Sequence, residues 1–406
     1  MSYKYVKRTI EPQLCRAAKE FPAVVLTGPR QSGKTTVIKE VFGHDYKYVS
    51  MELPDIRIIA ENDPRGFLAE FSGRVIFDEI QYCPVLLPYI KELIDSDRQT
   101  KGRFILTGSQ NLMLTENINE SLAGRAAILK LYPFSLREYS HAGSSPFPWE
   151  QGYDPEQKKV PEENLWQFLL RGLYPEIATD THRSSSLWHS SYISTYIERD
   201  VRLIKHVSDL GNFQVFLQAL AIRNGQLLNL SEISRDIGVA VNTVKNWLSV
   251  LEATFQIVIL RPYFENAGKR IVKSPKVYFT DIGTLCSLTG ISDPVHLQKG
   301  PMGGSVFETC VIMELVKTFS SRAEPPKIYF WRTSAGDEVD IVVIHENKLI
   351  PIEIKLSSTP KISMARGINV LKEALPDKCL NGYVVYPGSL RLPLGSGTTA
   401  VPLRAF

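Results

Sequence analysis

Residues 28–35 read Gly-Pro-Arg-Gln-Ser-Gly-Lys-Thr, which matches the phosphate-binding pattern GxxxxGK[ST] at every defined position. An apolar run at 23–26 precedes this stretch and a helix-compatible segment at 36–41 follows it, so strand, loop and helix stand in the order that supports such a loop. The two glycines let the backbone turn tightly, so that successive N–H groups point at the phosphates. The sequence therefore predicts a phosphate-binding loop, the Walker A motif.

Two side chains at the end of the loop have separate expected roles. We expect the ammonium of Lys34 to reach the β- and γ-phosphates and the hydroxyl of Thr35 to bind Mg²⁺. The helix that follows adds the partial positive charge of its N-terminus. ATP and Mg²⁺ are therefore the expected cofactors. The residues expected to bind the nucleotide are Gly28, Pro29, Arg30, Gln31, Ser32, Gly33, Lys34, Thr35, Thr36 and Asp78.

Two further apolar runs end in polar residues that suit nucleotide hydrolysis. The run at 74–77 ends in Asp78 and Glu79, a Walker B pattern. Asp78 is expected to hold Mg²⁺, directly or through water, and Glu79 to polarise the attacking water. The third run ends at Thr107 and Ser109, and either hydroxyl is a candidate to bind the γ-phosphate or the water. A simple turn at the end of a strand is the alternative for either residue.

Together these residues resemble the AAA+ ATPase superfamily, with Ser109 at the position called sensor 1. The strings LTGPRQSGKTT, VIFDEIQ, FILTGSQ, SLAGR and LYPFSLREY are similar to one prokaryotic group, in which an AAA+ module precedes a poorly characterised C-terminal region. The resemblance runs over nearly the whole chain. It implies that Arg125 is a candidate arginine finger, which stabilises charge on the transferring phosphoryl group and can act on a neighbouring subunit. A surface salt bridge is the alternative for Arg125.

Residues 227–280 have the pattern of a winged helix. Two short helices around a Gly-containing turn precede two strands with a polar tip between them. The helices are predicted at 230–237 and 242–248 and the strands at 255–260 and 277–279. The basic residues of the wing that are candidates for phosphate contacts are Lys269, Arg270, Lys273 and Lys276. A winged helix that only packs against protein is the alternative, because the net charge of the chain is low at +4.

The C-terminal part predicts a β-hairpin that carries a second set of acids. Glu353 and Lys355 share one face of a strand, and hairpin pairing brings Asp340 beside them. This pattern resembles the restriction-endonuclease-like superfamily, and Glu308 matches the helix acid often seen there. The resemblance implies Glu308, Asp340 and Glu353 as metal ligands and Asp340, Glu353 and Lys355 as catalytic residues. A solvated strand face with alternating Glu and Lys is the alternative.

The composition adds limits on the class of protein. The five cysteines form no Cys-x-x-Cys pair, which argues against a zinc ribbon and fits a reducing cytosol. No apolar run approaches about 18 residues and no signal peptide is evident, so we expect a cytoplasmic protein that does not enter a membrane.

The fold class expected is α/β: an AAA+ P-loop parallel sheet with a helical subdomain, then a winged helix and a C-terminal α/β restriction-endonuclease-like domain. The predicted regions are the ATPase core at 1–140, a loop or linker at 141–164, the helical subdomain at 165–225, the winged helix at 226–300 and the nuclease-like domain at 301–406.

The function expected is Mg²⁺-dependent ATP hydrolysis that moves these C-terminal regions on DNA, with nucleotide-dependent self-association. Whether the nuclease-like domain cleaves, and whether Arg125 acts in cis or in trans, is open at this stage. The alternative is a regulatory nucleotide switch whose C-terminal domains bind protein or DNA without cleavage.

Overall fold

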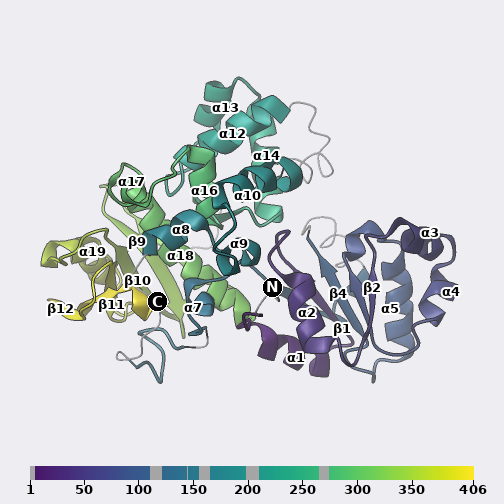
Figure 1. The fold of residues 1–406 in the computed structure, drawn as a ribbon. Coiled ribbons are helices and arrows are strands. Elements are labelled where there is room, and N and C mark those ends of the chain that lie inside the picture. The colour runs from purple at the N-terminus through teal and green to yellow at the C-terminus, as the bar shows by residue number, and fades with distance from the viewer. Residues whose placement is uncertain (1–4, 110–120, 144, 155–164, 198–209, 265–273) are drawn as a thin grey trace.

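The computed structural model describes residues 5–109, 121–143, 145–154, 165–197, 210–264 and 274–406 (Figure 1). Its N-terminal part is a five-stranded sheet in the order β2-β3-β4-β1-β5, and every pair of neighbours is parallel. The strands are β1 (Ala23–Thr27), β2 (Lys47–Ser50), β3 (Val75–Asp78), β4 (Phe104–Gly108) and β5 (Ala126–Lys130). The predicted parallel α/β core is therefore confirmed.

Helices cover both faces of this sheet, which explains why β1, β3 and β4 are apolar runs rather than alternating patterns. Val24 and Leu26 of β1 pack with helices α1 (Glu11–Glu20) and α2 (Lys34–Phe42) on one face. Ala23 and Val25 pack on the other face with the helices α3 (Pro54–Asn62), α4 (Pro64–Ala69) and α5 (Leu86–Ser96).

A helical region joins the N-terminal sheet to the C-terminal part, and these two parts lie on opposite sides of the view in Figure 1. Its elements are α7 (Leu136–Tyr139), α8 (Leu165–Arg171), α9 (Pro175–Thr179), α10 (Ser185–Tyr192), α12 (Leu210–Ile222), α13 (Leu230–Ile237), α14 (Val241–Ala253), α16 (Ile282–Thr289) and α17 (Pro294–Lys299). Strands β6 (Ile257–Leu260) and β7 (Lys276–Phe279) form an antiparallel pair after α14. The predicted wing residues Lys269, Arg270 and Lys273 lie outside the described residues. Lys276 begins β7 and is buried in ion pairs with Glu308 and Glu338, so in this structure it is not a surface contact for phosphate.

The C-terminal part is a mixed six-stranded sheet in the order β12-β13-β11-β10-β9-β8. Its strands are β8 (Ile328–Arg332), β9 (Glu338–His345), β10 (Lys348–Ile354), β11 (Gly382–Tyr386), β12 (Leu392–Gly395) and β13 (Thr398–Pro402). Helices α18 (Gly303–Ser321) and α19 (Arg366–Ala374) accompany it. β9 and β10 are antiparallel and form a hairpin that turns at Glu346 and Asn347, both with positive φ.

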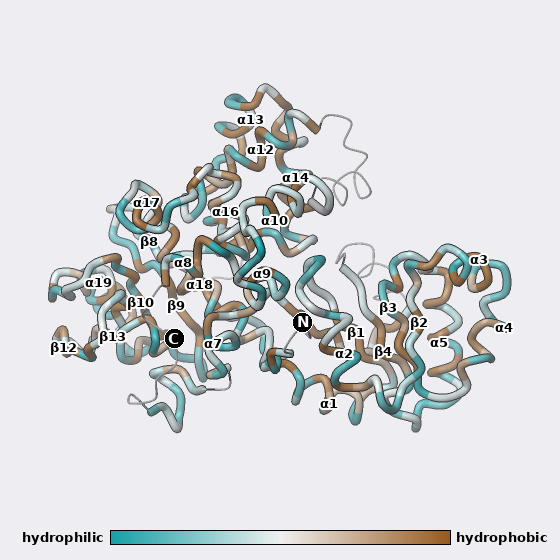
Figure 2. The backbone as a smooth tube through the Cα atoms, viewed as in Figure 1, coloured by the Kyte–Doolittle hydropathy of each residue, from teal (hydrophilic) through white to brown (hydrophobic). Residues whose placement is uncertain are grey.

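One hydrophobic core extends from Phe134 to Phe406 and joins the helical region to the C-terminal sheet. Helix α18 contributes many residues to this core and is buried on nearly all sides. Figure 2 shows the hydropathy of each residue along the chain, with apolar stretches in brown. The described part of 141–164 is packed on this core, since Phe147 is fully buried and stacks on Trp149. Within the described residues, no helix combines the length and hydropathy needed to cross a membrane.

Candidate functional site

The predicted phosphate loop joins the carboxyl end of β1 to the first turn of α2, and its path requires two glycines. A Cβ atom on Gly28 would lie 2.0 Å from the carbonyl oxygen of Leu131, far inside van der Waals contact. Gly33 has a φ of 91° and is the N-cap of α2, a left-handed conformation that glycine adopts without strain. The loop thus ends at a helix N-terminus, where free N–H groups and the helix dipole favour a phosphate.

Lys34 lies buried between the loop and the second acid of the Walker B pattern. Its Nζ donates to the carbonyl oxygens of Gly28 at 3.1 Å and Pro29 at 3.0 Å, and lies 3.9 Å from Oε1 of Glu79. Burial acts to raise the pKa of Glu79, but the charge of Lys34 and the bond from Gln81 outweigh it, so this pKa is lowered from 4.5. Glu79 is therefore ionised at neutral pH, as a residue that polarises water must be.

Asp78 is surrounded by hydroxyl groups. Its Oδ2 accepts hydrogen bonds from Thr35 Oγ1 at 2.8 Å and from Tyr48 OH at 2.7 Å, and its Oδ1 accepts one from Thr107 Oγ1. A carboxylate beside the Thr35 hydroxyl is a set of hard oxygen donors, and these residues fit Mg²⁺.

The sequence does not decide between the hydroxyls of Thr107 and Ser109, and the structure gives them different neighbours. Thr107 is engaged with Asp78 and also accepts a hydrogen bond from the backbone N–H of Glu79 at 2.9 Å. Ser109 Oγ instead accepts a hydrogen bond at 3.1 Å from the amide of Gln81, which also donates to Glu79 Oε2. Ser109 therefore lies next to the acid expected to polarise water. The sequence assigned no role to Gln81, although it is the last residue of the string VIFDEIQ.

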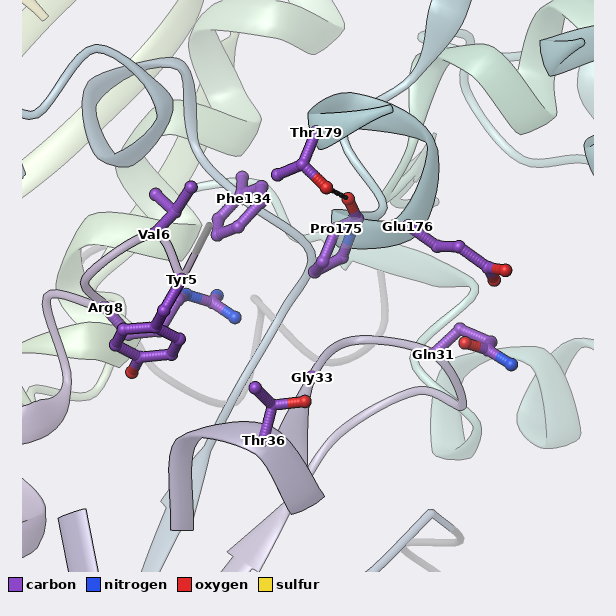
Figure 3. Close-up of a pocket in the computed structure, with 10 residues that line it drawn as sticks. All are labelled: Tyr5, Val6, Arg8, Gln31, Gly33, Thr36, Phe134, Pro175, Glu176 and Thr179. Carbon is purple, nitrogen blue, oxygen red and sulfur yellow. Dashed lines mark hydrogen bonds between the residues drawn. The ribbon is translucent and has the colours of Figure 1, made fainter. Parts of the chain in front are cut away.

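A cavity of about 400 Å³ opens beside the loop, between the N-terminal segment and α9 (Figure 3). It is lined by Tyr5, Val6, Arg8, Gln31, Gly33, Thr36, Phe134, Pro175, Glu176 and Thr179. Of these, only Gln31, Gly33 and Thr36 were expected from the sequence. The others come from segments far apart in the chain, and the sequence assigned a role to none of them, although Phe134 lies in the string LYPFSLREY.

Arg8 connects this cavity to the rest of the molecule. Its guanidinium donates to the carbonyl oxygens of Ser32 at 2.9 Å and Tyr132 at 2.7 Å. It also forms an ion pair with Glu138 at 3.1 Å, and the two side chains are only 4% and 6% exposed. The plane of the guanidinium lies over the ring of Phe134. Arg8, near the N-terminus, therefore holds the phosphate loop in place through its hydrogen bond to Ser32.

We predict that Arg8→Ala lowers the free energy of unfolding by about 3–5 kcal/mol, because it leaves Glu138 buried without its partner. Chemical denaturation of the purified protein measures this change. Arg16→Ala is the matched control, because the Arg16–Glu20 ion pair is exposed and contributes little. Equal loss of stability in the two variants would contradict the role given to Arg8.

The predicted arginine finger lies away from the phosphate loop of its own chain. The carbonyl oxygen of Arg125 accepts a hydrogen bond from Ala23 at the start of β1, whereas the loop follows Thr27 at the other end of the strand. The length of β1 alone therefore places the backbone of Arg125 about 13 Å from the start of the phosphate loop. The guanidinium of Arg125 makes a bidentate pair with Asp95 of α5, with both bonds at 2.8 Å.

The acids and the lysine predicted for the C-terminal domain lie close together. Lys355 Nζ is 2.5 Å from Glu353 Oε2 and 3.3 Å from Asp340 Oδ2, and Asp340 also accepts a hydrogen bond from the N–H of Ile354. Burial, and then the nearby charge of Asp340, raise the pKa of Glu353. Burial also raises the pKa of Glu308, and the charge of Asp340 acts in the same direction.

The metal site expected at Glu308, Asp340 and Glu353 stays a prediction, because lysines occupy the space between these acids in the structure. In the part of the chain that the structure describes, no three His, Cys, Asp or Glu side chains are placed to hold a metal ion together. The physical reason is that lysines lie among these carboxylates: Lys355 contacts Asp340 and Glu353, and Lys276 contacts Glu308. The residues therefore do not fit a divalent metal in this arrangement.

Three family models match the chain. One is described as an AAA domain and covers residues 20–140, and the others are domains of unknown function, DUF8612 at 162–295 and DUF4143 at 303–406. The C-terminal matches carry no functional description, so a winged helix and a nuclease-like domain remain predictions.

The chain is also similar to whole proteins. An uncharacterized protein of Mycobacterium tuberculosis is 32% identical over 405 residues, which cover 98% of this chain and 83% of the relative. An uncharacterized protein of Methanocaldococcus jannaschii is 24% identical over 375 residues, which cover 87% of this chain and 78% of the relative.

The chain also resembles solved structures, among them two with low scores. The Walker-type ATPase of Pyrococcus abyssi has a TM-score of 0.44 at 16% identity, covering 69% of this chain and 94% of its own. The RuvB Holliday junction branch migration motor of Thermotoga maritima has a TM-score of 0.29 at 16% identity, with coverages of 64% and 93%. These scores are too low to support an argument about the site. The assignment rests on the AAA domain match and on the mycobacterial relative: the chain belongs to the family of that relative, and its N-terminal part is an AAA domain with a P-loop ATPase fold.

Proposed function

We propose that the protein hydrolyses ATP in a Mg²⁺-dependent reaction. The observation that carries this proposal is the convergence of Lys34, Thr35, Asp78 and Glu79 at the carboxyl edge of the sheet. This edge is where ligands bind in open parallel sheets. The phosphate loop and the two acids lie far apart in the sequence, and chance alone does not bring such a set together.

The residues of the chain divide the work of the reaction. The loop N–H groups and Lys34 bind and orient the β- and γ-phosphates. Thr35 and Asp78 would hold Mg²⁺, which neutralises the charge that develops on the phosphates. Glu79 is ionised and polarises the attacking water, while Gln81 keeps its carboxylate next to Ser109.

We place the base of the nucleotide in the cavity beside the loop. The cavity begins at Gly33 and Thr36, and its far wall is formed by Val6, Phe134 and Pro175 (Figure 3). An apolar and aromatic wall next to a phosphate site suits a flat heterocycle. Because this wall comes partly from α9, nucleotide binding would bring the helical region and the ATPase core together.

Two chains of contacts lead from the loop into the rest of the molecule. Tyr192 OH donates to the carbonyl oxygen of Arg30 at 3.4 Å and accepts from Gln256, next to β6, at 3.1 Å. On the other side, Glu138 pairs with Arg8 and belongs to α7, whose first backbone N–H groups donate to Glu314 of α18. We propose that these contacts transmit the hydrolysis cycle to the C-terminal regions.

We further propose that residues 226–300 form a winged helix that binds DNA. What supports this is the order of α13, α14, β6 and β7, together with the outer face of α14. On that helix Asn242, Lys245 and Asn246 are exposed, while Val244 and Trp247 are buried. A polar helix face of this kind is available to enter a groove.

If the wing contacts DNA, replacing Lys269, Arg270 and Lys273 by Ala weakens binding and reduces its salt dependence. We expect the slope of log affinity against log salt to fall by about one for each phosphate that the variant no longer neutralises. Fluorescence anisotropy with a labelled duplex measures both quantities. The matched control removes the same charge from the ATPase core, at Arg16, Lys19 and Arg98. An unchanged slope in the wing variant would place DNA binding elsewhere.

A regulatory nucleotide switch is the second candidate function. It is favoured by the lysines among the C-terminal carboxylates, because a site filled by ammonium groups suits binding better than metal-dependent cleavage. ATP turnover measured with and without duplex DNA separates the two. Stimulation by DNA supports a DNA-linked ATPase, and slow turnover that DNA does not change supports the switch.

A further inference from the structure

Lys276 is a buried cation that the phosphate chemistry does not use. It is the first residue of β7, and only 6% of its surface is exposed. Its Nζ lies 2.6 Å from Glu338 Oε1 and 3.2 Å from Glu308 Oε1. These acids belong to β9 and α18, so the lysine reaches across from one region of the chain into another.

Further side chains surround the ammonium of Lys276 and its carboxylate partners. Its ammonium is also close enough to Asp340 to feel the charge of that carboxylate, and its Nζ lies over the ring of Phe330, 5.5 Å from the ring centre. Tyr278, two residues further along β7 and on the same face, donates to Glu308 Oε1 at 2.5 Å. Two neighbouring side chains of β7 therefore satisfy the same carboxylate of α18.

Charge balance explains why the lysine is needed. Four carboxylates gather here, those of Glu308, Glu338, Asp340 and Glu353. Lys355 neutralises Asp340 and Glu353 from one side, whereas Lys276 pairs with Glu308 and Glu338 from the other. Carboxylates withdrawn from water are costly without a positive partner. Lys276 supplies a buried positive charge, whereas the side chain of Lys355 is 36% exposed.

Backbone contacts seat the same region on the C-terminal sheet. Tyr263 N donates to Phe330 O at 2.6 Å and Phe330 N donates to Arg261 O at 3.1 Å, so the chain after β6 extends the edge of β8. Asn224 bridges the two parts by donating to Thr309 Oγ1 at 2.7 Å and accepting from Phe279 N. Lys276 therefore reaches the carboxylates from β7, which belongs to a region that is packed against the C-terminal sheet.

We propose that Lys276 is the resident cation of this cluster, in the position where a divalent metal would have to sit, and that it joins β7 to the C-terminal sheet. With the lysine in place the cluster takes no divalent ion. Removing its charge leaves Glu308 and Glu338 without their positive partner, close to Asp340, and a hard divalent ion can then substitute. This proposal does not rest on ATP hydrolysis.

The test is metal rescue of stability. In Lys276→Met, which keeps the apolar stem but removes the charge, the unfolding temperature of the full chain is expected to fall. Mn²⁺ without nucleotide is expected to raise it again, while the wild type shows no such shift. The double variant Lys276→Met, Asp340→Asn is the matched control and loses the rescue. Lys276→Arg, which keeps the charge, is expected to behave like the wild type.

Direct Mn²⁺ titration by electron paramagnetic resonance gives the second readout. One bound ion per chain is expected in Lys276→Met beyond any bound by the wild type, and this ion is lost in the double variant. Lys276→Gln replaces the Met variant if that protein does not fold. A wild type that binds Mn²⁺ through Asp340, or a folded charge-removing variant that gains no Mn²⁺ site, overturns the proposal.

Discussion

Glu79→Gln is expected to lower ATP turnover by about 10²–10⁴-fold, the usual contribution of a residue that accepts or polarises a proton. The amide has nearly the same shape as the carboxylate but cannot polarise the attacking water. Its charge is not needed to hold the phosphates, which the loop N–H groups and Lys34 bind. Nucleotide affinity is therefore expected to remain. Phosphate release measures turnover, and a fluorescent ATP analogue measures binding.

Lys34→Ala is the companion variant and is expected to lose nucleotide binding as well, because it removes the cation that contacts the β- and γ-phosphates. Glu52→Gln provides the control, since Glu52 is exposed and lies just after β2. Equal turnover in the wild type, Glu79→Gln and Lys34→Ala would refute the proposed hydrolysis. Loss of binding in Glu79→Gln would instead assign that carboxylate to the support of Lys34, which lies 3.9 Å from it.

Arg125→Ala is expected to lower turnover by about 10³-fold or more if the residue is an arginine finger. Arg125 lies at the amino edge of the sheet, whereas the phosphate loop of the same chain lies at the carboxyl edge. The residue therefore acts on a neighbouring copy of the chain or not at all. Its pair with Asp95 would have to open or turn when that neighbour docks.

Mixing variants tests this arrangement. Arg125→Ala subunits keep an intact phosphate loop, and Lys34→Ala subunits keep an intact Arg125, so an interface between the two completes one site. Partial recovery of turnover on mixing is the expected result. Arg98→Ala is the control, because Arg98 pairs with the same Asp95 at 2.8 Å but is 66% exposed. A protein that stays monomeric with ATP at working concentrations would rule out action between subunits.

The ATPase core was predictable because its motifs consist of residues that are close together in the sequence. The phosphate loop needs consecutive residues in one strand-loop-helix unit, and the acids of Asp78 and Glu79 follow directly on a buried strand. Such features leave their complete signature within about ten residues of sequence. The β9–β10 hairpin is local in the same sense, and its register brings Asp340 beside Glu353 and Lys355.

The contacts that the sequence did not predict are long-range. Arg8 meets Glu138, which is 130 positions away, and Lys276 meets Glu308 at a distance of 32 positions. A single arginine or lysine carries no pattern that names such a partner. The hairpin likewise predicts where Asp340 and Glu353 lie but not the cation that another strand places beside Glu308, so the metal at Glu308, Asp340 and Glu353 stays a prediction.

The sequence by itself determined the chemistry of the phosphate loop and the parallel sheet that carries it, because both follow from the short-range geometry of strands, turns and helix ends. Only the tertiary structure decided which charges meet. It placed Arg8 behind the loop, Arg125 at the far edge of the sheet and Lys276 among the C-terminal carboxylates. A buried charge is stable only beside an opposite charge or a dipole, and the chain finds that partner by folding as a whole.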